Sequence, residues 1–196
     1  MRYLLLLTLL CSSCTVPPKM SEIDTKEIPP ILRVEHHMGV ITSHGSGVLV
    51  KYKGQLMIIS AHHVFEYCTD ASTISFLTQD RKPFKCILKR IVMLPAHDMI
   101  VIYVSNIASN ITPMQVGSYQ LNDTGFAAGY PDNERLLYGI GQITSERIRY
   151  SGTVKSGMSG GPLIVNGRVV GIASTRTAGE DAGEFIPVEK ALELIK

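Results

Sequence analysis

The chain has 196 residues, of which 45% are hydrophobic and 18% are charged. That length suits one large domain or two small halves that share a site, and the apolar fraction is enough to bury a sizeable core. Lys and Arg outnumber Asp and Glu by only two (19 against 17) and form no basic run, so the sequence gives no support to nucleic-acid binding.

The first thirteen residues have the pattern of an export signal. Arg2 supplies a short positive region, residues 3–10 are apolar except for Thr8, and small residues follow. Such a stretch is too short to span a bilayer as a structural helix. Residues 1–13 are therefore predicted to be a signal peptide, and the protein is expected to be exported.

Cys14 follows two serines in an arrangement that resembles a bacterial lipobox. The resemblance implies cleavage before Cys14, a lipid on its thiol, and a place at the bacterial cell envelope with the membrane as a partner. Cys11 stands where a lipobox typically has leucine, so ordinary secretion and an uncleaved anchor remain as alternatives. Residues 14–30 contain four prolines and little apolar periodicity, and we interpret them as a tether.

From residue 31 the chain has the pattern of short β-strands. His36 and His37 are adjacent on the first strand and so face opposite sides, which argues against a shared metal. Asn166-Gly167 is a strong signal for a tight hairpin, and Lys53-Gly54 is expected to form another. Strands are expected at 31–40, 47–52, 55–60, 73–77, 83–93, 98–104, 124–130, 139–148, 163–165, 168–173 and 184–187, with a polar link at 106–112 and an amphipathic helix at 188–196.

A glycine-rich loop, residues 157–163, surrounds a serine at position 159. A serine hydroxyl is a poor nucleophile at neutral pH, so it needs a base to take its proton and donors to hold the oxyanion. Glycine lets the backbone fold tightly there, so that the N–H groups of Gly157 and Ser159 can converge on one point. Alone, such a cluster is equally typical of an ordinary turn.

A histidine and an aspartate occur in matching contexts. His62 and His63 lie at the end of one apolar strand, and Asp98 opens another. A catalytic triad needs an imidazole that contacts the serine oxygen and a carboxylate that fixes the tautomer of that imidazole. The order His, Asp, Ser is one of those in which this geometry occurs. Two other carboxylates, Asp70 and Asp80, lie in polar stretches with no strand directly after them, so Asp98 is preferred.

Three motifs, residues 60–65, 98–102 and 157–163, together resemble those of trypsin-like serine proteases of the bacterial type, similar to the HtrA (Deg) and glutamyl endopeptidase branches. The resemblance implies an all-β, chymotrypsin-like fold: two six-stranded antiparallel β-barrels, the active site between them, and a short C-terminal helix. The protease domain would span 31–196, divided into barrels at 31–110 and 111–196. The chain leaves no room for the PDZ domain of full HtrA proteases, so their cage assembly and peptide sensing are not expected.

The resemblance also assigns roles. Ser159 attacks the peptide carbonyl to form an acyl-enzyme, His63 transfers the proton, and Asp98 orients His63. We favour His63 over His62 because an apolar residue, Val64, follows it. The backbone N–H groups of the nucleophile loop form the oxyanion hole, and the mechanism needs no metal or organic cofactor.

The substrate pocket is expected between two segments. By the family pattern its walls are residues 153–156, which begin with Thr153, and the run Ser174, Thr175 and Arg176. Thr153 occupies the position of the aspartate that gives basic specificity, so cleavage after Lys or Arg is disfavoured. Arg176 offers a charge for an acidic side chain, or else is a solvated loop residue. A small or aliphatic residue at the cut site stays open.

Two further cysteines, Cys68 and Cys86, would lie in an oxidising compartment, which permits a disulfide between them. Two separate buried thiols are an equal alternative, because the geometry that a disulfide requires is not visible in sequence.

The sequence therefore predicts a serine endopeptidase, exported and tethered to the membrane, that acts on protein or peptide substrates. A catalytically latent or inactive protease-like binding module is the alternative, although the triad residues and the glycines are all in place. A metal-binding lipoprotein would need clustered ligands, which strand alternation opposes. The oligomeric state is left open.

Overall fold

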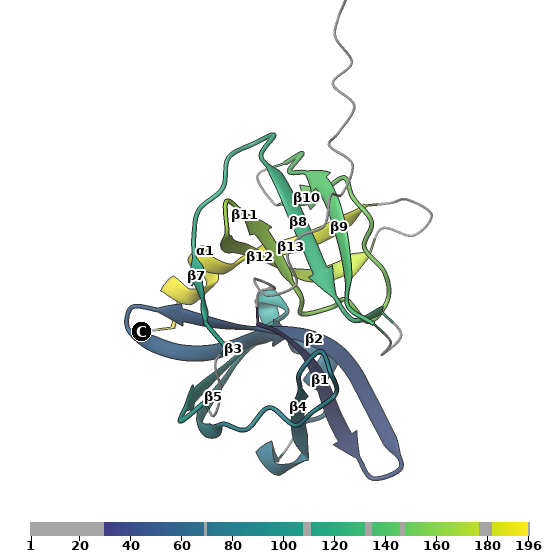
Figure 1. Ribbon diagram of the computed structural model, residues 1–196, viewed down its shortest axis with the longest axis vertical. Coiled ribbons are helices and arrows are strands. Elements are labelled where there is room, and N and C mark those ends of the chain that lie inside the picture. The colour runs from purple at the N-terminus through teal and green to yellow at the C-terminus, as the bar shows by residue number, and fades with distance from the viewer. Residues whose placement is uncertain are drawn as a thin grey trace, which may run out of the picture.

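The computed structural model describes residues 30–68, 70–107, 111–131, 135–145, 148–176 and 182–195. The predicted signal peptide and nearly all of the tether lie outside these residues. The described chain forms two antiparallel β-barrels and one short helix, with β1–β6 below β8–β13 in Figure 1. This confirms the all-β, two-barrel architecture. Within the described residues, no helix is long and apolar enough to cross a membrane.

The first barrel has six strands in the order β4–β1–β2–β3–β6–β5. A bridge between Leu77 and Pro83 joins the end of β4 to the segment before β5. The elements are β1 (Ile31–Met38), β2 (Ile41–Tyr52), β3 (Gln55–Ala61), β4 (Ile74–Leu77), β5 (Ile87–Leu94), β6 (Met99–Ser105) and three 3₁₀ turns, η2 (His62–Phe65), η3 (Ala71–Thr73) and η4 (Pro95–His97).

The second barrel has the order β9–β8–β11–β12–β13–β10. A bridge between Ile143 and Tyr150 closes it between the end of β9 and β10. Its elements are β8 (Thr124–Gly129), β9 (Leu137–Gln142), β10 (Arg149–Tyr150), β11 (Pro162–Val165), β12 (Arg168–Arg176), β13 (Gly183–Pro187) and the helix α1 (Val188–Glu193).

A seventh strand, β7 (Met114–Val116), was not expected from the sequence. It pairs in parallel with β2 of the first barrel and with β12 of the second, so the barrels share one continuous sheet. Three residues are too short for an alternation pattern to be recognised. The predicted strand 139–148 is also wrong in extent, because β9 ends at Gln142 and the chain turns before β10.

The two predicted hairpins have the backbone that a type I′ turn requires, with positive φ at both central residues. The angles are 47° and 81° at Lys53 and Gly54, and 50° and 72° at Asn166 and Gly167. The first turn sets the register of β2 against β3 and the second sets that of β11 against β12.

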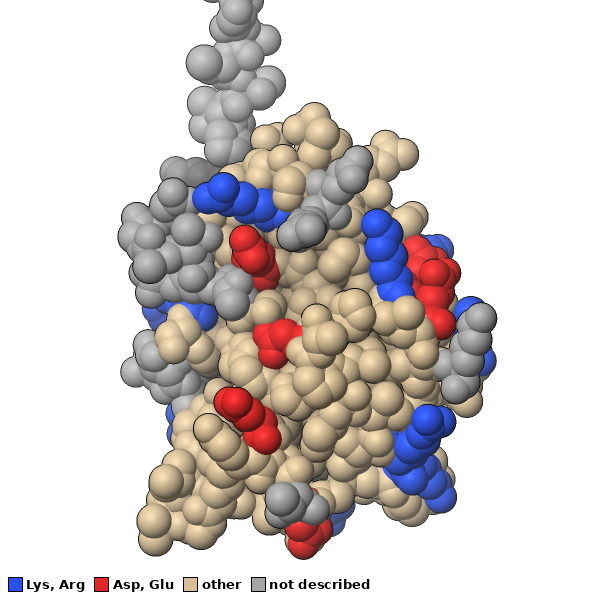
Figure 2. Space-filling view, turned by 180° about the vertical axis from the view of Figure 1, so that it is seen from behind, with Lys and Arg blue, Asp and Glu red and all other residues tan. Residues whose placement is uncertain are grey.

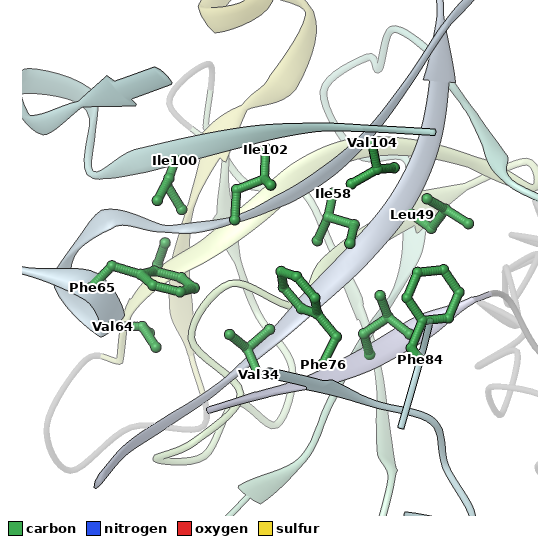
Figure 3. Close-up of a cluster of buried hydrophobic side chains, with 12 residues drawn as sticks. Val34, Leu49, Ile58, Val64, Phe65, Phe76, Phe84, Ile100, Ile102 and Val104 are labelled. Carbon is green, nitrogen blue, oxygen red and sulfur yellow. The ribbon is translucent and has the colours of Figure 1, made fainter. Parts of the chain in front are cut away.

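Buried apolar side chains form clusters inside the first barrel, inside the second, and between the two. Ile58 and Ile100 belong to the first-barrel cluster, drawn in Figure 3, whereas their neighbours Ile59 and Val101 belong to the cluster between the barrels. Both faces of β3 and β6 are therefore buried, which explains why these strands are continuously apolar. The inter-barrel core consists of Val48, Val50, Met57, Ile59, Met99, Val101, Val169, Ile172, Val188, Ala191 and Leu192.

Charged side chains are dispersed over the surface. On the face shown in Figure 2, Lys and Arg lie mostly toward the margins, and separate patches of Asp and Glu lie both nearer the middle and at the margins, with uncharged surface between them. The net charge of +2 is not gathered into one basic region on this face.

We predict that Ile102→Ala lowers the free energy of unfolding by about 2–5 kcal/mol, because it leaves a cavity in the first-barrel core. Ile102 has no exposed surface, whereas Ile87 is 46% exposed on β5. The matched change Ile87→Ala should cost less than about 1 kcal/mol. Urea unfolding of both variants measures the difference, and equal losses would contradict this assignment of the core.

Candidate active site

The register of two strands brings His63 to Asp98. Ala61 at the end of β3 pairs with Met99 at the start of β6, and the N–H of His62 continues the ladder by donating to the Asp98 carbonyl at 3.0 Å. The chain then enters η2, whose Val64 and Phe65 point into the first-barrel core (Figure 3). His63 consequently faces outward, with 42% of its side chain exposed.

The Asp98 carboxylate accepts three hydrogen bonds. His63 Nδ1 lies 2.9 Å from Oδ2 and 3.0 Å from Oδ1, and the backbone N–H of His63 donates to Oδ1 at 2.9 Å. The Ser174 hydroxyl, on β12 of the second barrel, donates to Oδ2 at 2.5 Å. Asp98 itself ends η4 in the left-handed region, with φ 45° and ψ 41°. His63, not His62, therefore carries the imidazole that faces the carboxylate.

The pair shifts the pKa values of both partners in the directions expected for a charged carboxylate. The hydrogen bond to Asp98 raises the pKa of His63 above its ordinary value, although burial acts in the opposite sense. Burial is the largest influence on Asp98 and would raise its pKa. The hydrogen bonds from His63 and Ser174 together outweigh it, so the pKa of Asp98 lies below its ordinary value. Asp98 is thus ionised near neutral pH and holds Nδ1 of His63 in its protonated form.

The loop around Ser159 depends on two glycines with positive φ, 85° at Gly157 and 84° at Gly160. A Cβ atom on Gly160 would lie 2.1 Å from the Ser46 carbonyl oxygen, so only glycine fits there. Between them Met158 is 1% exposed and packs in the second-barrel core. Gly160 N–H donates to the Ala173 carbonyl at 2.7 Å, which extends the β11–β12 ladder to the residue after Ser159.

Two backbone N–H groups of the serine loop, those of Gly157 and Ser159, have no acceptor in the part of the chain that the structure describes. Within the described residues, neither the N–H of Gly157 nor that of Ser159 makes a hydrogen bond, whereas the N–H groups of Met158, Gly160 and Gly161 all do. Most backbone N–H groups in a folded chain are paired, so two free donors next to a serine are available to a ligand. The Ser159 hydroxyl makes no hydrogen bond to His63 in this structure, and such contacts often tighten only when substrate binds.

Ser159, His63 and Asp98 line one cleft of about 580 Å³ between the barrels. Val154 and Ala173, 5% and 3% exposed, contribute an apolar part of its wall. The remaining lining residues are Lys155, Ser156 and Ser174. A cleft that holds these groups together has the parts that acyl transfer requires: a nucleophile, an oriented imidazole and free donors.

The predicted pocket residues differ in their placement. Ser174 lines the cleft, but its hydroxyl is bonded to Asp98, a contact that the sequence does not reveal. Thr153 does not line the cleft, although its neighbours 154–156 do. The side chains of Thr175 and Arg176 lie outside the described part of the structure, as does Cys14. Cys68 and Cys86 are free, half-buried thiols, so the structure agrees with the alternative of two separate thiols and not with a disulfide between them.

Comparisons with known proteins agree with this geometry. The model of the trypsin-like peptidase domain matches residues 45–172, more than half of the chain. The fold is similar to the crystal structure of the serine endoprotease from Yersinia pestis, with a TM-score of 0.69 and 23% identity over 85% of this chain and 61% of that chain. The structure of the HtrA-type protease AlgW with decapeptide gives a TM-score of 0.69 and 17% identity over 85% of this chain and 63% of that chain. Comparison with curated proteins gives no match.

This chain spans less than two thirds of the length of either similar structure, and at these identities the likeness concerns the fold. The family match covers the strand that precedes His63, the aspartate before β6 and the serine loop, which are the three motifs that the structure brings to one cleft. The chain therefore belongs to the trypsin-like peptidase family and has the fold of a bacterial serine protease.

Proposed function

We propose that this protein is a serine endopeptidase that uses His63, Asp98 and Ser159. One observation carries the proposal: the hydrogen-bonded His63–Asp98 pair shares a cleft with Ser159, and among the described residues the N–H groups of Gly157 and Ser159 have no acceptor. Each part is ordinary alone, but together they match what acyl transfer needs. Protein or peptide is then the substrate, as the family implies.

The roles follow from the hydrogen bonds. Asp98 accepts from Nδ1 of His63, which leaves the lone pair on Nε2 free to take the Ser159 proton. The Ser159 oxygen attacks the peptide carbonyl, and the oxyanion accepts from the N–H groups of Gly157 and Ser159. His63 returns its proton to the leaving amine, and an acyl-enzyme remains. Water then repeats the sequence, which releases the acid and restores Ser159.

The cleft disfavours a basic side chain at the cut site. Val154 and Ala173 are buried apolar parts of the wall, and no aspartate is among the lining residues except Asp98, which is engaged with His63. A basic side chain would bring a charge to an apolar surface without a partner. Of the two preferences that the sequence left open, the apolar wall supports the small or aliphatic one, whereas Lys155, which also lines the cleft, supports the acidic one.

We also propose that the protein is exported and held at the cell envelope by a lipid on Cys14. The support is the sequence of residues 1–14 and the tether pattern that follows it. Release of the domain by secretion is the alternative, which fractionation distinguishes.

A fluorophosphonate probe should label the full chain, and Ser159→Ala should abolish the labelling. His63→Ala should abolish it as well, and peptide hydrolysis by either variant should fall by about 10⁴-fold or more. Ser118→Ala, at an exposed serine away from the cleft, is the matched control and should label normally. A folded wild type without labelling would instead support the latent or binding-module reading. Loss of labelling in His62→Ala but not in His63→Ala would show that the base is misassigned.

The hydrolysis rate should rise with pH through a value above about 6.5, the ordinary pKa of histidine, because only neutral His63 can accept the proton and Asp98 raises its pKa. Asp98→Asn removes that charge, so the pKa of His63 should fall. Titration of the His63 ring proton by NMR in Ser159→Ala and in Ser159→Ala/Asp98→Asn measures the change. A pKa that stays the same or rises in the double variant would rule out this role of Asp98.

Cys14→Ser should prevent incorporation of a fatty-acid label and move the protein from the membrane fraction to the soluble fraction. Cys68→Ser, which alters a half-buried thiol in the folded domain, should leave both unchanged. Labelling that persists in Cys14→Ser would disprove attachment at this residue.

A further inference from the structure

Ser46 connects the first barrel to the loop that carries Ser159. It lies on β2, is fully buried, and uses each of its polar groups. Its N–H donates to the Ser159 carbonyl at 2.7 Å, and its hydroxyl donates to the Gly157 carbonyl at 2.9 Å while accepting from the Tyr130 N–H at 2.8 Å. Its own carbonyl accepts from the Ser60 hydroxyl at 2.7 Å.

These contacts hold two peptide groups, one on each side of the nucleophile. In the peptide between Gly157 and Met158, the carbonyl is held by the Ser46 hydroxyl and the N–H by the Lys155 carbonyl at 3.1 Å. In the peptide between Ser159 and Gly160, the carbonyl is held by the Ser46 N–H and the N–H by the Ala173 carbonyl. Ser46 thus supplies one of the two anchors of each peptide.

The peptide that carries the free N–H of Gly157 is held less firmly. Among the described residues, neither the Ser156 carbonyl nor the Gly157 N–H makes a backbone hydrogen bond. The direction of that N–H therefore follows from φ of Gly157, 85°, and from the anchored peptide after it. Glycine has no Cβ to restrict its rotation, so the constraint must come from the neighbouring contacts.

We propose that the Ser46 hydroxyl is a positioning group for the oxyanion site: by fixing the Gly157 carbonyl, it keeps the Gly157 N–H directed into the cleft. The inference rests on the proposed function and deepens it. Without the hydroxyl, the peptide after Gly157 keeps only one anchor and Gly157 can rotate, so the site has one aligned donor fewer for part of the time. Loss of an oxyanion donor costs about 10²–10³-fold in rate, and partial misalignment costs less.

The test compares hydrolysis of an ester with that of its thiono analogue, in which sulfur replaces the carbonyl oxygen. Sulfur accepts hydrogen bonds poorly, so only the oxygen ester benefits from aligned donors. In Ser46→Ala, kcat/KM for the ester should fall by about 10–10²-fold while that for the thionoester changes little. The quantity compared is kcat/KM for the ester divided by kcat/KM for the thionoester. This ratio does not depend on the fraction of folded enzyme, so a merely structural role of Ser46 would leave it unchanged.

Ser60→Ala is the matched control. It also deletes a buried hydroxyl bonded within this cluster, and that hydroxyl packs close to Gly160, but it donates to the Ser46 carbonyl and makes no hydrogen bond to the loop of Ser159. The ratio should stay near the wild-type value in Ser60→Ala. An equal fall in both variants would overturn the inference, as would an unchanged ratio in Ser46→Ala.

Ser46→Cys is used if Ser46→Ala does not fold, because cysteine is close to serine in volume and its thiol is a weak hydrogen-bond donor. The ester-to-thionoester ratio of Ser46→Cys should lie below that of the wild type. If the wild type is active and the ratio is unchanged in both Ser46→Ala and Ser46→Cys, this inference alone is overturned. A folded wild type that is neither labelled by fluorophosphonate nor able to hydrolyse the ester overturns the proposed function, and this inference with it.

Discussion

A half-buried carboxylate, that of Asp98, receives hydrogen bonds from both barrels, and the candidate site is arranged around it. His63 donates from the first barrel and Ser174 from the second. Burial alone would favour the neutral acid, so these donors are what keep the group ionised. A neutral Asp98 could donate a proton to Nδ1 and would no longer select the tautomer that leaves Nε2 free. The charge state of one side chain thus decides whether His63 can act as a base.

Asp98 stands in this position at a conformational cost. Its φ of 45° lies in the left-handed region, which costs about 1–3 kcal/mol for a residue other than glycine. Its backbone is held on both sides, since its N–H donates to the Pro95 carbonyl and its carbonyl accepts from His62, both at 3.0 Å. β3 and β6, which enter and leave this corner, are buried on both faces. The strained residue therefore lies between two strands whose packing and hydrogen bonds hold it in place.

Most of the fold follows from local pattern, because short apolar runs and the Asn-Gly and Lys-Gly turns mark strands and hairpins without knowledge of their partners. The three motifs of the site are also local, which is why His63, Asp98 and Ser159 can be selected from the sequence with the help of a family resemblance. What escapes is set by distant pairing. β7 is recognisable only between β2 and β12. The Ser174–Asp98 and Ser46–Gly157 bonds join residues 76 and 111 positions apart, and serine is too common for either to be noticed in sequence.

The inter-barrel core and the serines between the barrels have different tasks. Burial of apolar side chains such as Ile59 and Val169 attracts the barrels to each other, but this attraction is not directional and tolerates small shifts. Acyl transfer needs its groups placed within about 0.5 Å. Hydrogen bonds are directional, and a serine hydroxyl reaches only a short way from the backbone. Ser46 and Ser174 therefore fix the relative position of the barrels at the two points where position matters, the oxyanion loop and the carboxylate. Because the apolar core supplies the larger share of the attraction, deleting either hydroxyl should impair catalysis more than it impairs folding.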